Sequence, residues 1–82
     1  MDHDKKTIRI LAFGPAAEML KGDSIVAEGL KDLDALKSWL DLHYAGWSEL
    51  GVRMAVNRKI IQGNTALQDG DEVALLPPFS GG

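Results

Sequence analysis

The chain has 82 residues and a formal net charge of −3. This length predicts a single domain, residues 1–82, with a thin core and little material for a deep, enclosed pocket. The acidic balance argues against a nucleic-acid partner, which requires a basic surface. There is no cysteine, no signal-peptide pattern and no apolar run that could cross a bilayer, so we expect a cytoplasmic protein without a membrane partner.

The first part of the chain predicts two strands with a short helical turn between them. Residues 7–13 are rich in β-branched and apolar side chains, and Gly14-Pro15 ends the run. Both faces of this segment are apolar near its end, where Leu11 and Phe13 follow Ile8 and Ile10, which indicates a central strand. A helical turn is expected over residues 16–20 and a second strand over residues 24–28.

One long helix is predicted over residues 33–44. Asp32 is its expected N-cap, because a carboxylate can accept hydrogen bonds from the free N–H groups of the first turn. Leu33, Leu36 and Leu40 recur at helical spacing and form the face that should pack on a sheet. His43 falls in the last turn, where a structural role is expected.

The second part of the chain predicts three more strands. Residues 52–57 alternate as a half-buried strand does, and Asn57-Arg58 is a candidate turn into a short strand at residues 59–61. Asp69-Gly70 signals a tight turn before a last strand at residues 72–76. The order strand, strand, helix, strand, strand, strand predicts an α+β domain of the β-grasp, ubiquitin-like type, although other α+β folds share it.

No recognised catalytic constellation occurs in the sequence. Neither a phosphate-binding glycine loop nor a metal-ligand cluster is present, so we expect this chain to bind no cofactor or metal. Asp69, Asp71 and Glu72 surround a turn, for which a solvated loop is the simplest interpretation.

The C-terminal residues carry the strongest functional signal. Pro77-Pro78 ends the last strand and stiffens the chain, and residues 77–82 are predicted to be a flexible tail. Gly81-Gly82 adds almost no side-chain bulk, so it can enter a narrow channel and leaves its carboxylate open to attack. A carboxylate must be activated before it reacts, most simply as an acyl-adenylate. Displacement of AMP by sulfur then leaves a thiocarboxylate.

These features resemble the small subunit of molybdopterin synthase (MoaD-like), a member of the ubiquitin-like sulfur carriers. The resemblance covers residues 7–82 and is strongest from Met54 onward. It lies in Ala55-Val56-Asn57, in the segment from Asp69 to Ala74, and above all in the ending Pro77-Pro78-Phe79-Ser80-Gly81-Gly82. The sequence departs from the family at Ala17-Glu18-Met19, where Arg-Glu-Leu is common, at Leu75-Leu76, where aromatic residues are common, and at Phe79, where valine is common.

The resemblance implies a sulfur carrier for molybdenum cofactor biosynthesis. An E1-like adenylating enzyme would use ATP to activate Gly82, a sulfur donor protein would convert it to a thiocarboxylate, and the sulfur would pass to cyclic pyranopterin monophosphate. The large synthase subunit would be the partner, in a heterotetramer of two small and two large subunits. The predicted catalytic residues are Gly82 and Gly81, and the predicted partner-binding residues are Ile60, Leu76, Pro77, Pro78, Phe79 and Ser80.

Three alternatives remain open from the sequence. A sulfur carrier for thiazole (thiamine) synthesis shares the fold and the Gly-Gly end, although such carriers usually lack the diproline. A ubiquitin-like protein modifier would use the same tail chemistry to join Gly82 to lysines. An inert β-grasp interaction module would use no tail chemistry at all.

Overall fold

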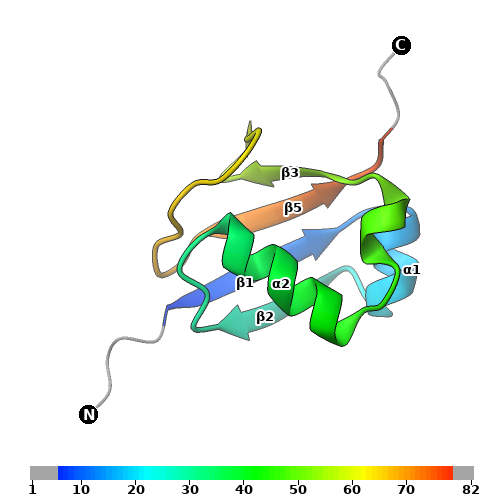
Figure 1. Cartoon of the computed structure of the whole chain (residues 1–82), viewed down its shortest axis with the longest axis horizontal. Helices are drawn as coiled ribbons and strands as arrows, with labels where there is room; N and C mark the ends of the chain where they lie inside the picture. The colour runs from blue at the N-terminus through cyan, green and yellow to red at the C-terminus, as the bar shows by residue number, and fades with distance from the viewer. Residues whose placement is uncertain (1–5, 79–82) are drawn as a thin grey trace.

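The computed structural model describes residues 6–78, and these form one mixed sheet with helices at one face and one end (Figure 1). The predicted Phe79, Ser80, Gly81 and Gly82 lie outside the described residues. In chain order the elements are β1 (Thr7–Ala12), α1 (Pro15–Leu20), β2 (Ser24–Glu28), α2 (Leu33–His43), the 3₁₀ helix η1 (Trp47–Leu50), β3 (Arg53–Val56), β4 (Lys59–Ile60) and β5 (Glu72–Leu76).

The sheet has five strands in the order β2-β1-β5-β3-β4. The last strand, β5, lies in the middle and pairs parallel with β1, with Ile10 opposite Val73. All other neighbours are antiparallel, including β5 and β3, where Ala74 faces Ala55. The predicted β-grasp arrangement is therefore confirmed: a mixed sheet with one main helix across one of its faces (Figure 1).

The core lies between α2 and the inner face of the sheet. Leu33, Leu36 and Leu40, the predicted helix stripe, are completely buried. They belong to one cluster with the alternate residues of the two central strands that point inward, Ile8, Ile10, Ala12, Val73 and Leu75. Burial of these aliphatic side chains is the main force that holds the helix on the sheet.

The start of α2 is fixed by polar contacts to the loop that precedes β5. The Asp32 carboxylate accepts a 2.8 Å hydrogen bond from the Ala35 N–H, which confirms the predicted N-cap. Asn64 donates to the other Asp32 oxygen at 3.2 Å and accepts from the Asp34 N–H at 2.8 Å. The hydrogen bond from Ala35 and then that from Asn64 lower the pKa of Asp32 below its ordinary value, since both stabilise the charged form.

Two local features differ from the sequence prediction. The helix ends at His43 with Tyr44 as its C-cap, one residue before its predicted end, and Gly46, with a φ of 88°, precedes an additional 3₁₀ helix, η1. The Trp47 indole N–H donates to Asp41 and so ties this unpredicted turn back to α2. No helix within residues 6–78 is long and apolar enough to span a membrane.

Candidate functional site

Among residues 6–78 no helix packs on the outer face of the sheet, which is nevertheless partly apolar (Figure 1). Leu11, Ala74 and Leu76 are all half-buried and alternate with the inward-pointing core residues of β1 and β5. Ala55 is only 4% exposed although it points to this outer side and does not belong to the core cluster. A layer of neighbouring side chains, rather than a helix, therefore covers the middle of this face.

These residues line a shallow groove of about 400 Å³, which we call the sheet-face groove. It draws on four strands and on the turn between β3 and β4. Its lining residues are Leu11, Phe13, Ala55, Arg58, Ile60, Glu72, Ala74 and Leu76. The structure thus brings together Ile60 and Leu76, two of the residues predicted to bind a partner. Ile60 is 50% exposed, so much of its apolar surface is open to a partner.

The sequence interpretation missed most of the groove. It took Leu11 and Phe13 as signs of a central strand, because they make both faces of the segment apolar near its end. The strand is central, but Phe13 follows it and is 45% exposed. The signal that could have identified these residues is their phase. Leu11 and Phe13 point opposite to Ile8 and Ile10, and the one long helix that the sequence predicts can cover only one face of the sheet.

The two prolines that follow β5 lie against two glycines of other elements. A Cβ built on Gly14 would be 3.5 Å from the Pro77 ring, and one built on Gly51 would be 3.5 Å from Pro78. Both glycines have positive φ, 60° and 66°, and flank the start of α1 and the end of η1. Pro77 and Pro78 are therefore seated on the domain, which sets the direction in which the chain leaves β5.

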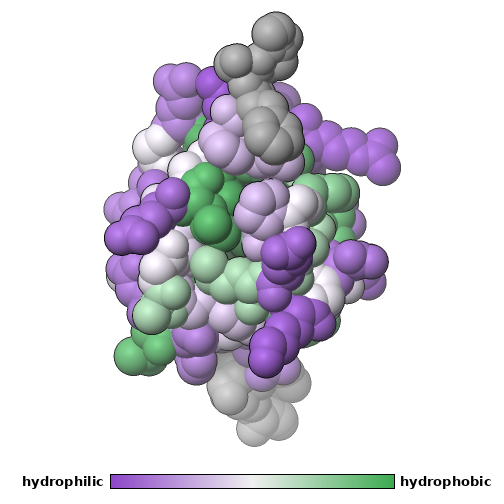
Figure 2. Space-filling view, turned by 90° about the vertical axis from the view of Figure 1, so that its right-hand side faces the viewer, coloured by the Kyte–Doolittle hydropathy of each residue, from purple (hydrophilic) through white to green (hydrophobic). Residues whose placement is uncertain are grey.

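Figure 2 shows the end of the molecule formed by α1 and the carboxyl end of β5. Hydrophilic residues surround a small apolar area there. A surface of this kind can offer a protein partner a contact beside the point where the chain leaves the sheet.

The acidic residues before β5 have structural roles. Asp69 accepts a 2.8 Å hydrogen bond from the Thr7 N–H, and Asp71 accepts one of 2.8 Å from the Gln68 N–H. Asp71 also accepts from the Asn57 side chain at 2.9 Å. The prediction of a solvated turn agrees with the exposed positions of these hydrogen bonds. Its carboxylates also link the turn to Thr7 of β1 and to Asn57 between β3 and β4.

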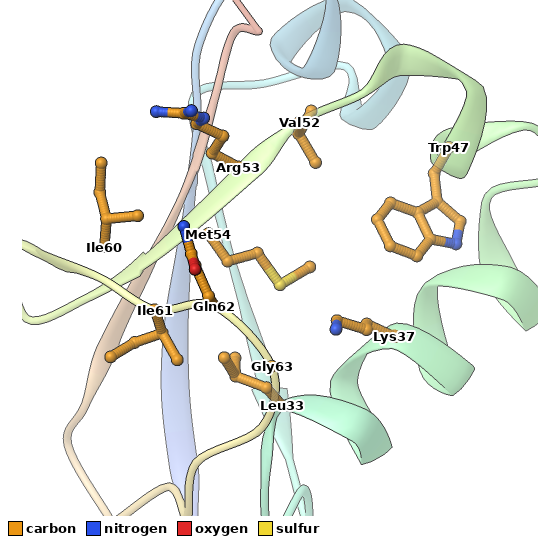
Figure 3. A pocket seen from close by; sticks show the side chains of 10 residues that line it. All are labelled: Leu33, Lys37, Trp47, Val52, Arg53, Met54, Ile60, Ile61, Gln62 and Gly63. Atoms are coloured by element: carbon orange, nitrogen blue, oxygen red, sulfur yellow. The ribbon is translucent and has the colours of Figure 1, made fainter.

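A second hollow of about 220 Å³ lies on the opposite side of β3, between α2, η1 and the loop after β4. Figure 3 shows Lys37 and Trp47 on this side, while Arg53 and Ile60 point away from them across the strand. The lining contains the Lys37 ammonium group but no carboxylate or imidazole. It therefore lacks a pair of groups for acid–base catalysis.

The described residues offer no catalytic machinery of their own. Within residues 6–78 no three His, Cys, Asp or Glu side chains are grouped to hold a metal ion. The structure provides an apolar groove that a protein surface can cover. It also provides a stem, Pro77-Pro78, which packs against the domain at the end of β5. Such a domain can present a chain end to another protein.

A family model described as the ThiS family matches residues 10–82. This chain belongs to the ThiS family. The match includes every groove residue and both prolines of the stem. No curated protein matches the chain by sequence.

Solved structures that resemble this ThiS-family chain include a molybdopterin-converting factor and SAMP1. A complex of subunits 1 and 2 of the molybdopterin-converting factor from Helicobacter pylori contains a chain that is 33% identical, with a TM-score of 0.69 over 93% of this chain and 99% of that one. SAMP1 from Haloferax volcanii is 25% identical, with a TM-score of 0.72 over 93% and 99%. The HVO 2177 protein of Haloferax volcanii is 24% identical, with a TM-score of 0.82 over 100% and 92%, and so supports the fold.

Proposed function

We propose that this protein is the sulfur-carrying small subunit of a molybdopterin synthase. The observation that carries the proposal is the 33% identity, over nearly the whole chain, to a component of the Helicobacter pylori complex of subunits 1 and 2. The ending Pro77-Pro78-Phe79-Ser80-Gly81-Gly82 supports the same assignment. In this proposal the large subunit covers the sheet-face groove and receives the tail that follows Pro77 and Pro78.

The proposed chemistry takes place at the Gly82 carboxylate. An E1-like enzyme joins this carboxylate to the AMP part of ATP and releases pyrophosphate. A persulfide on a donor protein then attacks the acyl carbon and displaces AMP. A second thiol cleaves the S–S bond of the resulting acyl disulfide, which leaves the thiocarboxylate on Gly82 and a disulfide on the donor side. The thiocarboxylate passes its sulfur to cyclic pyranopterin monophosphate bound to the large subunit, and water returns Gly82 to a carboxylate. ATP is bound by the activating enzyme, and this chain holds no cofactor.

In this proposal the domain positions the C-terminal tail, and its partner proteins supply the catalytic groups. The seated Pro77 and Pro78 aim the chain away from the sheet, and two terminal glycines can pass through a narrow opening between protein surfaces. In this proposal the partner supplies the groups that complete the active site.

Intact-mass measurement tests this proposal. The protein is incubated with ATP, a sulfide source and its own organism's adenylating enzyme, and we expect one oxygen to be replaced by sulfur. Deletion of Gly82 should abolish this change and leave the melting temperature nearly unaltered, because a chain end makes few buried contacts. Ser80→Ala, a change in the same segment that retains both glycines, is the control and should still gain sulfur. An unchanged mass of the intact protein would refute the carrier function.

A second candidate function is that of a ubiquitin-like modifier, which the similarity to SAMP1, named a small archaeal modifier protein, favours. Here a lysine amine of a target protein, rather than sulfur, displaces AMP and forms an amide with Gly82. Conjugates of higher mass that disappear on deletion of Gly82 would support this function. Transfer of the sulfur to the pterin precursor after the large subunit is added would favour the synthase over both the modifier and a thiazole carrier.

A further inference from the structure

The turn between β3 and β4 has an unusual residue in a strained position. Val56 pairs with Lys59, so Asn57 and Arg58 form the two-residue loop of this hairpin. Both have positive φ, 50° and 74°. A loop with two left-handed residues matches the twist of its strands, and the usual sequence for it is Asn-Gly. Arg58 therefore occupies the position at which glycine is preferred.

Asn57 explains why a turn forms here, but it does not explain why an arginine follows at position 58. Asn57 tolerates positive φ and is fixed to β5 by three hydrogen bonds: its N–H donates to the Glu72 carbonyl at 2.8 Å, its side chain donates to Asp71 at 2.9 Å, and its side-chain oxygen accepts from the Glu72 N–H at 3.1 Å. These bonds would hold the turn equally well with glycine at position 58. The backbone strain at Arg58 thus needs a reason outside the hairpin.

The Arg58 side chain lines the sheet-face groove beside Ile60 and Glu72. The other two arginines of the chain, Arg9 and Arg53, are exposed on the same face, where Arg9 is opposite Glu72 and Arg53 opposite Leu76. All three arginines of a chain with net charge −3 therefore lie on the one sheet face that no helix covers.

Arginine is the cation enriched at protein interfaces, because its planar group pairs with a carboxylate through two hydrogen bonds and its stem packs on apolar surface. We propose that Arg58 is kept in its strained conformation because its guanidinium group pairs with a carboxylate on the protein that covers the groove. The partner surface is then apolar at its centre and carries Asp or Glu where it meets the β3–β4 turn. This inference rests on the proposed function, in which that partner is the large synthase subunit.

Replacement of Arg58 by glycine tests the inference, because it should improve the fold and impair the interaction. In Arg58→Gly the strain is removed, and we expect the melting temperature to rise by about 4 °C. The dissociation constant for the large subunit of the same organism, measured by titration calorimetry, should increase about tenfold or more. The affinity of the wild type should weaken with added NaCl, and that of the variant should do so less.

Lys21→Gly is the matched control. Lys21 is also a cation with positive φ, 59°, but it caps the end of α1 and does not line the groove. This variant should gain thermal stability as Arg58→Gly does, lose the same charge, and bind the large subunit as tightly as the wild type.

The results separate this inference from the proposed function. Unchanged binding by Arg58→Gly alongside a wild type that binds would overturn the role of Arg58 alone. Equal weakening in Lys21→Gly would also overturn it, since net charge rather than position would then be responsible. If the wild-type protein does not bind the large subunit, both the inference and the proposed function fail.

Discussion

The two faces of the sheet are built from the same strands but are completed in different ways. The inner face is covered by a helix of the same chain, α2, and Leu33, Leu36 and Leu40 of that helix are fully buried. The outer face carries apolar residues of the same strands without a helix above them, with Ile60 and Phe13 about half exposed. The inner face accounts for stability, and the outer face has apolar surface that a second protein can bury. Substitutions on the two faces should therefore have separable effects.

The largest expected effect on folding comes from the inner face. Leu36→Ala should lower the free energy of unfolding by about 2–5 kcal/mol, because it leaves a cavity in a fully buried position. Urea denaturation followed by circular dichroism measures this loss. Leu42→Ala is the control, since Leu42 lies on the same helix but is 80% exposed, and it should change stability little. Equal losses in both variants would contradict the assignment of α2 faces.

A comparable change on the outer face should affect association instead. Ile60→Asp should leave the urea midpoint close to that of the wild type, since Ile60 is half exposed, and should weaken binding of the large subunit by about 100-fold. The nearby Arg58 can offset part of the added charge. Val26→Asp provides the control: Val26 is 61% exposed on the same face, in β2, but lies outside the groove. If Val26→Asp weakened binding as strongly, the groove would not be the docking site.

A smaller effect is expected at the edge of the inner face, where Asp32 caps α2. Because hydrogen bonds from Ala35 and Asn64 lower the pKa of Asp32 in the folded protein, its carboxylate stabilises the fold above the unfolded-state pKa, near 3.8. This contribution is lost as the pH falls through the lower folded-state pKa. Asp32→Ala should therefore reduce the melting temperature more at pH 7 than at pH 3. A reduction of the same size at both pH values would show that the ionised carboxylate is unimportant.

The sequence predicted the elements whose limits are marked by particular residues. The bounds of β5 were predicted correctly because Asp69-Gly70 precedes the strand and Pro77-Pro78 ends it. The helix was predicted because Asp32 begins it and a leucine stripe follows. The turn η1 was missed, since four residues are too few to show a period.

The groove was harder to predict because its residues come from distant parts of the chain. Leu11, Ile60 and Leu76 share one surface only after β5 has paired with β1 on one side and β3 on the other. A sequence pattern shows which residues of one strand point to the same face, but it does not show which strands are neighbours. The strain at Arg58 was likewise hidden, because Asn57-Arg58 indicates a turn without giving its backbone angles.

The central place of β5 has a consequence for how this protein is made. The pairs β1–β2 and β3–β4 are joined in the sheet only through β5, which is synthesised after all of them. A nascent chain that lacks residues 72–76 has two separate hairpins, and isolated hairpins are at best marginally stable in water. Folding must therefore wait for nearly the whole chain to be translated. An interrupted product that ends before residue 72 would lack both the assembled sheet and the Pro77-Pro78 segment that packs against Gly14 and Gly51.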